Sequence, residues 1–209
     1  MTLCTHLPPL ISPKCLKFSP DGNELYCAGS GRVIAAWDIS SPKSKPKSVE
    51  FKGHMAAIKC LDIGKKKAVS GGLDRTVRVW ARLGAKEVTR FTGHKGTLLS
   101  VSLSPDEETV ASSGKDGIVR IWEADTAIQF HKIMGYNHSY DTNVLKFSPD
   151  GSLLAGGSND DAIRGESERG AKAKGGAESE TTNRILRLIL RRAARSEAAR
   201  SEATVLHEQ

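Results

Sequence analysis

Hydrophobic and polar residues alternate in short runs along most of this chain, and turn-forming residues separate the runs at intervals of about ten. Thr76–Trp80 and Ile118–Trp122 are rich in β-branched residues and alternate strictly, which is typical of half-buried strands. Other runs flank Ser-Pro-Asp sequences at Ser19–Asp21, Ser104–Asp106 and Ser148–Asp150, where Pro and Asp favour a tight turn. The pattern predicts strands throughout residues 14–164 and no helix in that stretch.

The strand pattern recurs at a nearly constant spacing. Lys66–Trp80 (KKAVSGGLDRTVRVW) is similar to Glu108–Trp122 (ETVASSGKDGIVRIW), and Trp37, Trp80 and Trp122 lie 43 and 42 residues apart. A period of 40 to 45 residues predicts a repeat architecture with about four short strands in each copy. The fourth, outer strands are expected at Ser48–Phe51, Val88–Phe91 and Ile128–Ile133.

This repeat resembles the WD-repeat family of β-propellers, in which Gly-His opens a copy and Trp-Asp closes it. Gly53-His54 leads to Trp80, Gly93-His94 leads to Trp122, and Trp37-Asp38 is the one literal Trp-Asp pair. The resemblance covers residues 14–164 and implies an all-β fold, an incomplete propeller ring of about four blades. The first copy lacks the opening Gly-His, and the fourth lacks the closing Trp.

The resemblance also implies a hydrogen-bonded relay inside each blade, formed by a His, a Ser, a turn Asp and the Trp indole. The matching residues are His54, Ser70, Asp74 and Trp80 in the second copy, His94, Ser112, Asp116 and Trp122 in the third, and His138 and Asp160 in the fourth, where Gly156 replaces the Ser. Ser, His and Asp together are also the set of a hydrolase triad. Because the set recurs and includes a Trp donor, we interpret it as support for the fold.

Family members bind peptides and domains on the face formed by the loops between strands. The resemblance places partner-binding residues three and five positions after the repeat His and just before the turn Asp. The candidates are Ala57, Lys59, Leu73, Thr97, Leu99, Lys115, Asp141, Asn143 and Asn159. This mixture of basic, apolar and polar residues suggests a peptide or acidic partner, and hence a non-enzymatic protein-interaction scaffold.

Charge and composition leave one alternative function open. The chain of 209 residues has 31 Lys and Arg against 24 Asp and Glu, a net charge of +7. This surplus permits an RNA- or ribonucleoprotein-associated subunit that binds through basic loops, although aromatics make up only 5% and no stacking platform is visible. The basic residues concentrate locally at Lys43–Lys52, Lys65–Lys67 and Arg184–Arg195.

Several other classes of protein are disfavoured. The four cysteines form no CxxC pair, which argues against a metal site, and no phosphate-binding Gly loop or cofactor motif is present. No signal peptide and no apolar run long enough to span a membrane is visible, so we expect an intracellular protein, cytoplasmic or nuclear. An enzyme is not expected.

The composition changes abruptly after Arg164. We expect residues 1–13 to be an N-terminal extension, 165–183 a disordered linker and 184–209 a basic amphipathic helix or low-complexity tail. Such a helix could bind calmodulin or an anionic membrane surface, although incidental helicity in a disordered end is favoured.

About three and a half blades would leave two apolar faces uncovered. Three explanations compete: a truncated or misassembled product, closure by association with another half-propeller (homo- or hetero-association), or a tail helix that covers one face. We favour the first.

Overall fold

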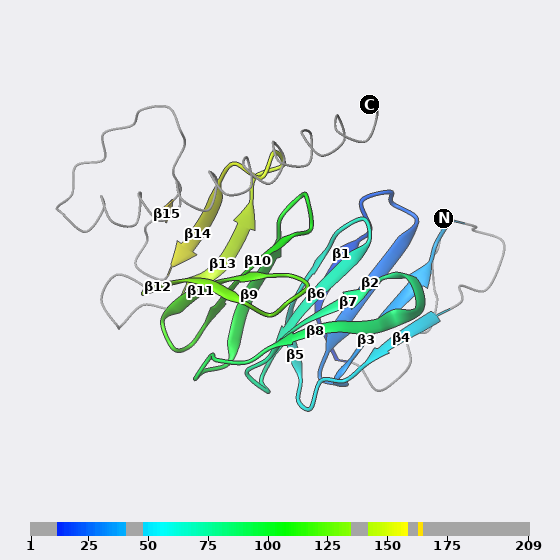
Figure 1. Ribbon diagram of the computed structural model, residues 1–209. Helices are drawn as coiled ribbons and strands as arrows, with labels where there is room; N and C mark the ends of the chain where they lie inside the picture. Colours follow the sequence, from blue (N-terminus) through cyan, green and yellow to red (C-terminus); the bar gives the residue numbers. More distant parts are fainter. Residues whose placement is uncertain (1–11, 41–47, 135–141, 159–162, 165–209) are drawn as a thin grey trace, which may run out of the picture.

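The computed structural model describes residues 12–40, 48–134, 142–158 and 163–164. Within them, antiparallel strands form four sheets that follow one another along the chain, and the sheets lie side by side (Figure 1). Sheet 1 contains β1 (Pro13–Phe18), β2 (Glu24–Gly29), β3 (Val33–Asp38) and β4 (Ser48–Lys52). Sheet 2 contains β5 (Ile58–Ile63), β6 (Lys67–Gly72), β7 (Val77–Ala81) and β8 (Lys86–Phe91).

The remaining strands form sheets 3 and 4. Sheet 3 contains β9 (Leu98–Leu103), β10 (Thr109–Gly114), β11 (Ile118–Glu123) and β12 (Gln129–Met134). Sheet 4 contains β13 (Thr142–Phe147), β14 (Leu154–Ser158) and the two-residue β15 (Ile163–Arg164). In each sheet, every strand pairs with the strand that follows it in the chain, so each sheet is a simple antiparallel meander.

The all-β class predicted from the alternation is confirmed. The three outer strands form within two residues of their expected bounds: β4 ends one residue later, β8 begins two residues earlier, and β12 is shifted by one residue. The described residues contain one helical turn, a 3-10 turn at Leu83–Ala85, where Gly84 has a φ of 82°. They contain no helix long and apolar enough to cross a membrane. The expected linker and tail helix, residues 165–209, lie outside the described residues.

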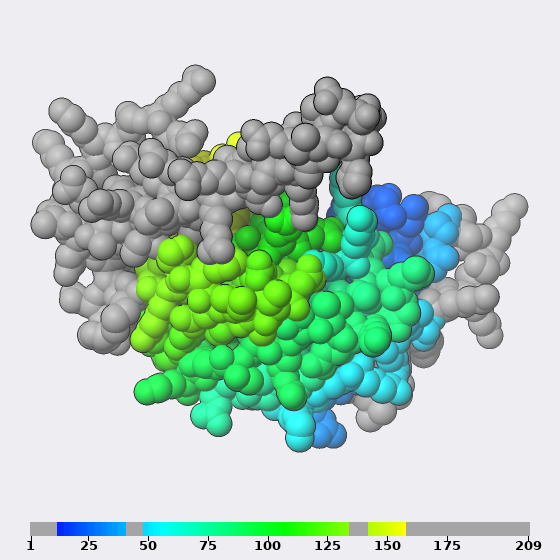
Figure 2. All heavy atoms as spheres, in the orientation of Figure 1, coloured from blue at the N-terminus to red at the C-terminus, as the bar shows by residue number. Residues whose placement is uncertain are grey.

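Apolar side chains fill the space between consecutive sheets. Tyr26, Ile34 and Phe51 of sheet 1 share one buried cluster with Leu61 and Trp80 of sheet 2. A second cluster joins sheets 2 and 3, and a third joins sheets 3 and 4. Figure 2 shows the outer surfaces of sheets 2 and 3 as one continuous surface. Sheets 2 and 3 are each packed against a neighbouring sheet on both faces. Because a strand presents alternate residues to opposite faces, their strands have apolar residues at both sets of positions.

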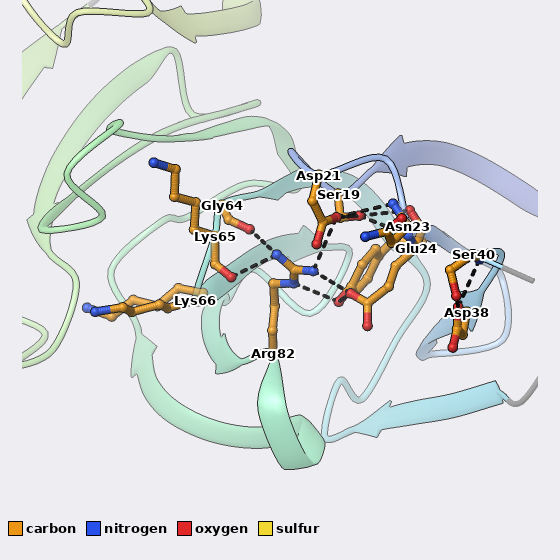
Figure 3. A network of polar contacts seen from close by, with 12 residues as sticks. Ser19, Asp21, Asn23, Glu24, Asp38, Ser40, Gly64, Lys65, Lys66 and Arg82 are labelled. Atoms are coloured by element: carbon orange, nitrogen blue, oxygen red, sulfur yellow. Dashed lines mark hydrogen bonds and ion pairs between the residues drawn. The ribbon is translucent and has the colours of Figure 1, made fainter.

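Arg82 links sheets 1 and 2 at the end of the sheets where β7 stops (Figure 3). Its guanidinium donates to the carbonyls of Gly64 (2.9 Å) and Lys65 (2.7 Å), to the Tyr26 hydroxyl (3.0 Å) and to the Glu24 carboxylate (2.5 Å). Burial and the hydrogen bond that the hydroxyl donates to Glu24 raise the pKa of Tyr26 to about 12, so the phenol stays protonated. The cluster joins two sheets through charge-assisted hydrogen bonds.

Glu107 makes the corresponding link between sheets 2 and 3. Its carboxylate accepts backbone N–H groups from Lys65, Lys66 and Lys67, and the Lys67 ammonium donates to the Glu107 carbonyl at 3.0 Å. Glu107 has a φ of 63°, an unfavourable region for a side-chain-bearing residue, and glycines occupy the same turn position at Gly22 and Gly151. The three backbone hydrogen bonds offset this cost.

Candidate functional site

The four residues of the sheet 2 relay converge from different elements. His54 lies in the connection before β5, Ser70 on β6, Asp74 in the turn after β6, and Trp80 on β7. The His54 ring contacts Asp74 through Nδ1 (2.7 Å) and Ser70 Oγ through Nε2 (2.7 Å). The Trp80 indole N–H donates to the same Ser70 Oγ at 2.8 Å. One chain of hydrogen bonds therefore crosses the sheet from the turn to β7.

The donors and acceptors fix the direction of this chain. The indole N–H only donates, so Ser70 Oγ accepts from Trp80 and its own hydrogen is available for His54 Nε2. With Nε2 facing the Ser70 hydroxyl, we assign a proton of the His54 ring to Nδ1, which donates it to the Asp74 carboxylate. Every buried polar atom of the relay then has a partner, which avoids the cost of burying an unsatisfied group.

Asp74 is the acceptor at the end of the relay and also organises its own turn. It accepts the Met55 N–H (2.9 Å), the Thr76 N–H (3.1 Å) and the Thr76 hydroxyl (2.9 Å). Burial alone would raise the pKa of this carboxyl. The hydrogen bonds from His54, Met55 and Thr76 outweigh that effect and hold the pKa far below its usual range.

Sheet 3 contains the same arrangement. His94 contacts Asp116 through Nδ1 (2.9 Å) and Ser112 Oγ through Nε2 (2.9 Å), and Trp122 donates to Ser112 Oγ at 2.8 Å. Burial lowers the pKa of His94, an effect that the Asp116 carboxylate only partly offsets, so the ring is neutral at neutral pH. Ile118 occupies the position of Thr76, so no hydroxyl takes the place of the one that Thr76 donates in sheet 2.

The geometry of Ser, His and Asp matches a hydrolase triad, but the surroundings do not. Ser70 and Ser112 are both 0% exposed, so a substrate carbonyl has no access to either hydroxyl oxygen. Each oxygen is also occupied by an indole N–H. No group of three or more His, Cys, Asp or Glu side chains suited to a metal ion occurs in the described part of the chain.

Sheets 1 and 4 depart from this pattern. Cys27 and Gly156 pair with Leu16 and Leu145, just as Ser70 pairs with Leu61, so neither sheet has a relay hydroxyl. Burial raises the pKa of the Cys27 thiol. The remaining relay candidates, His138 and Asp160, lie outside the described residues.

The partner-binding candidates lie around the same turns as the relays. The Leu73 N–H donates to the Ala57 carbonyl and the Lys115 N–H to the Thr97 carbonyl, each at 2.8 Å, so these candidates adjoin in pairs. The exposed candidates are Lys59, Leu73, Lys115 and Asn143, and the half-buried ones are Ala57, Thr97 and Leu99. Asp141 and Asn159 lie outside the described residues.

The structure also gathers cationic side chains that the sequence reasoning did not bring together. The strand register places one end of sheets 1–3 at the β2–β3, β6–β7 and β10–β11 turns, which we call the loop end. Exposed basic residues there are Lys14, Arg32, Lys52, Lys59, Arg75, Lys95 and Lys115. The carboxylates in the described turns of the loop end are Asp74 and Asp116. Both are buried against the histidines of the relays, so they do not balance the exposed basic residues.

The opposite end of the sheets has the opposite character. Its exposed acidic residues are Asp21, Asp38, Asp106, Asp125 and Asp150, against exposed Lys65, Lys66 and Lys86. Three of these aspartates belong to Ser-Pro-Asp turns, where each accepts a hydrogen bond from the Ser hydroxyl. The net charge of the chain is therefore distributed unevenly, and its cationic side is the loop end.

Apolar exposure distinguishes the loop end further. Met55 and Leu73 are exposed there, beside the cationic residues. Phe18 is the one aromatic among the large exposed hydrophobics of the described residues, and it lies at the opposite end of β1. The described loop end thus offers charge and aliphatic surface but no aromatic side chain for base stacking.

Comparison with known proteins gives consistent matches. The sequence pattern of the family described as "WD domain, G-beta repeat" matches residues 45–81, 85–123 and 131–164. The guanine nucleotide-binding protein subunit beta-like protein of Encephalitozoon cuniculi is 28% identical over 169 residues, which cover 68% of this chain and 49% of that protein. The guanine nucleotide-binding protein subunit beta of Arabidopsis thaliana is 28% identical over 160 residues, covering 70% of this chain and 42% of that protein.

A larger protein also matches. Apoptotic protease-activating factor 1 of Homo sapiens is 28% identical over 150 residues, which cover 71% of this chain and 12% of that protein. The chain thus spans about half the length of the first relative and a much smaller part of this one.

Proposed function

Because the chain belongs to the WD domain, G-beta repeat family, we propose that it is a protein-interaction scaffold whose loop end binds an acidic segment of a partner protein. The observation that carries this proposal is the gathering of exposed lysines and arginines at the loop end, described above. Two relatives are named as a guanine nucleotide-binding protein subunit beta and a subunit beta-like protein, which supports a role in protein assembly.

The charges at the loop end favour an acidic partner for a physical reason. Basic side chains of one sign on one surface attract a chain of opposite charge over distances of about 10 Å at moderate salt. A single exposed ion pair contributes about 0.2–1 kcal/mol, so useful affinity requires several of them together. Met55 and Leu73 add aliphatic surface that an apolar side chain of the partner can cover.

The relays have a separate role in this proposal. We infer that they hold the turns that present the loop end, since Asp74 fixes Met55 and Thr76 while Asp116 fixes Lys95. The relays act through the loops and do not touch the partner. Neither a cofactor nor a metal is part of the proposal.

Binding of a labelled acidic peptide, rich in Asp and Glu with Leu at intervals, tests the proposal by fluorescence anisotropy. Lys59→Glu combined with Lys115→Glu is expected to weaken binding by about tenfold or more, since two attractive contacts become repulsive. Lys66→Glu with Lys86→Glu makes the same change of charge at the opposite end and serves as the matched control.

Three outcomes contradict the proposal. One is an absence of binding by the unmodified chain at low salt, and another is equal loss in both double variants. The third is tighter binding of a single-stranded RNA probe than of the peptide, which would favour the nucleic-acid alternative instead.

A further inference from the structure

The first strand of sheet 1 has two large apolar side chains in solvent. Leu16 is 56% exposed and Phe18 is 65% exposed. The residues that occupy the position of Leu16 in sheets 2, 3 and 4 are Leu61, Val101 and Leu145, and all three are buried. The position of Phe18 corresponds to Leu103 and Phe147, which are also buried, and to the half-buried Ile63. The four sheets have apolar residues at the same two positions, but these side chains are exposed only in sheet 1.

The packing of the sheets explains this difference. Leu61 packs with Tyr26 and Ala28 of sheet 1, and Val101 packs with Val69 and Val79 of sheet 2. Leu145 and Phe147 in turn pack with Ala111 and Ile121 of sheet 3. In sheets 2–4 these side chains are therefore covered by the preceding sheet, and no described residues provide such a sheet for Leu16 and Phe18.

Sheet 4 has the complementary open face. Val144 is 61% exposed, whereas Cys60 and Ser100, at the same register position in sheets 2 and 3, are each 8% exposed. Ala155 is exposed as well, although its counterparts Tyr26, Val69 and Ala111 are buried against the following sheet. The open face of sheet 4 therefore has the residues that elsewhere cover the next sheet.

These two open faces are the two halves of one interface that the chain builds three times internally. We propose that a second copy of this chain completes it, with sheet 4 of each copy covering Leu16 and Phe18 of the other. Propellers close with typically 4–8 blades, and two copies of four sheets give a closed ring of eight related by a two-fold axis. Association of two such partial rings was one of the possibilities that the sequence left open.

The charges next to these faces are partly compensated within each copy. Lys17 and Lys146 would approach each other across the new junction, but both are directed toward Asp62 of their own copy. The Lys146 ammonium lies 2.7 and 2.8 Å from the two Asp62 oxygens, and the Lys17 ammonium lies 3.9 Å from one of them. Asp62 thus offsets one of the two lysine charges within each copy and draws both ammonium groups toward itself.

The mass of the full chain in solution, measured by light scattering after size exclusion, tests the stoichiometry. A mass of two copies is expected, and Leu16→Asp with Phe18→Asp should convert the dimer to monomer with unchanged far-UV circular dichroism. Val88→Asp with Ile128→Asp is the matched control, because these residues are also exposed apolar side chains but lie outside the two open faces. A monomeric wild-type chain, or a higher oligomer, overturns the proposal.

Cross-linking tests the pairing itself, even if the aspartate variant fails to fold. Internally, Leu61 lies in one cluster with Cys15, and Val101 lies in one cluster with Cys60, so Leu16 is expected beside Val144 of the other copy. A mixture of Leu16→Cys and Val144→Cys chains should give a covalent dimer under mild oxidation, whereas either variant alone should not. The wild-type chain controls for its own thiols, of which Cys15 has a pKa raised to about 11, mainly by burial. Equal cross-linking in the mixture and in the single variants overturns the proposal.

Discussion

Ser112→Ala is expected to destabilise the fold much more than Ser113→Ala, although both serines are 0% exposed and adjacent on β10. Ser112 Oγ has two partners, the Trp122 indole N–H at 2.8 Å and His94 Nε2 at 2.9 Å. Ser113 Oγ donates to the Thr142 carbonyl at 2.7 Å. Each substitution removes one serine hydroxyl from β10. The two substitutions differ in the number of buried polar groups that lose their hydrogen-bond partner.

The magnitude follows from the groups left without partners. Alanine at 112 leaves a buried indole donor and a buried imidazole acceptor unsatisfied, at a cost of about 1–3 kcal/mol each. The expected loss is therefore about 3 kcal/mol in the free energy of unfolding. Alanine at 113 removes a single hydrogen bond and leaves one carbonyl, for which about 1 kcal/mol is expected.

Urea unfolding followed by tryptophan fluorescence measures both losses, since Trp122 itself reports on the site. The comparison is valid if the denaturant slope is the same for the two variants. Equal midpoints for Ser112→Ala and Ser113→Ala would refute the reasoning, because the relay would then contribute no more than any other buried hydrogen bond. Ser70→Ala in sheet 2 is an independent repeat of the test.

Three further predictions concern pH and the links between sheets. The pKa of His94 is lowered in the folded state, so below about pH 6.5 the unfolded chain takes up a proton that the folded chain resists. The urea midpoint should therefore fall between pH 7.5 and 5, and less steeply in His94→Gln; identical slopes would contradict this. Glu107→Gln should cost about 2 kcal/mol, because a charged acceptor of three N–H groups becomes a neutral one. Thermal unfolding would show this loss against Glu50→Gln, a control at an exposed carboxylate that pairs with Lys52. Arg82→Met should speed hydrogen exchange in sheet 1 more than in sheet 3, and equal changes in both would show that the cluster in Figure 3 does not join sheets 1 and 2.

The alternation and the period were sufficient to predict the strands, whereas the residues of each relay were implied by the resemblance to the WD-repeat family. Strand alternation is a local property, and the Trp spacing fixes where each copy begins, so Thr76–Trp80 and Ile118–Trp122 were placed within one residue. The hydrogen bonds of the relays involve residues 10 to 22 positions apart within one copy. Because consecutive strands pair in a meander, residues at these short separations lie side by side in the sheet.

The links between sheets could not be predicted from these patterns. Glu107 contacts backbone about 40 residues away, and a glutamate after Ser-Pro-Asp has no distinguishing local signal. The one available indication was that glycine occupies the same position in two other copies. The cationic loop end was missed for a related reason, because basic residues that are scattered in the sequence come to one end only when the register of each strand is known.

Burial and polar satisfaction together explain what the relays contribute to sheets 2 and 3. A hydrogen-bonded imidazole and indole contribute most to stability where the face on which they lie is covered by another sheet, as Trp80 is by sheet 1 and Trp122 by sheet 2. In water their partners would be replaced at little cost. Sheets 2 and 3 are covered on both faces by described residues, whereas Leu16 and Val144 leave one face of sheets 1 and 4 open. In those two sheets the hydroxyl of Ser70 is replaced by the thiol of Cys27 and the hydrogen of Gly156. If a second copy of the chain covers the open faces, sheets 2 and 3 should remain more stable than sheets 1 and 4. Covering a face restores apolar contacts but supplies no relay. We therefore expect sheets 2 and 3 to exchange their amide hydrogens last, both in the single chain and in the assembled ring.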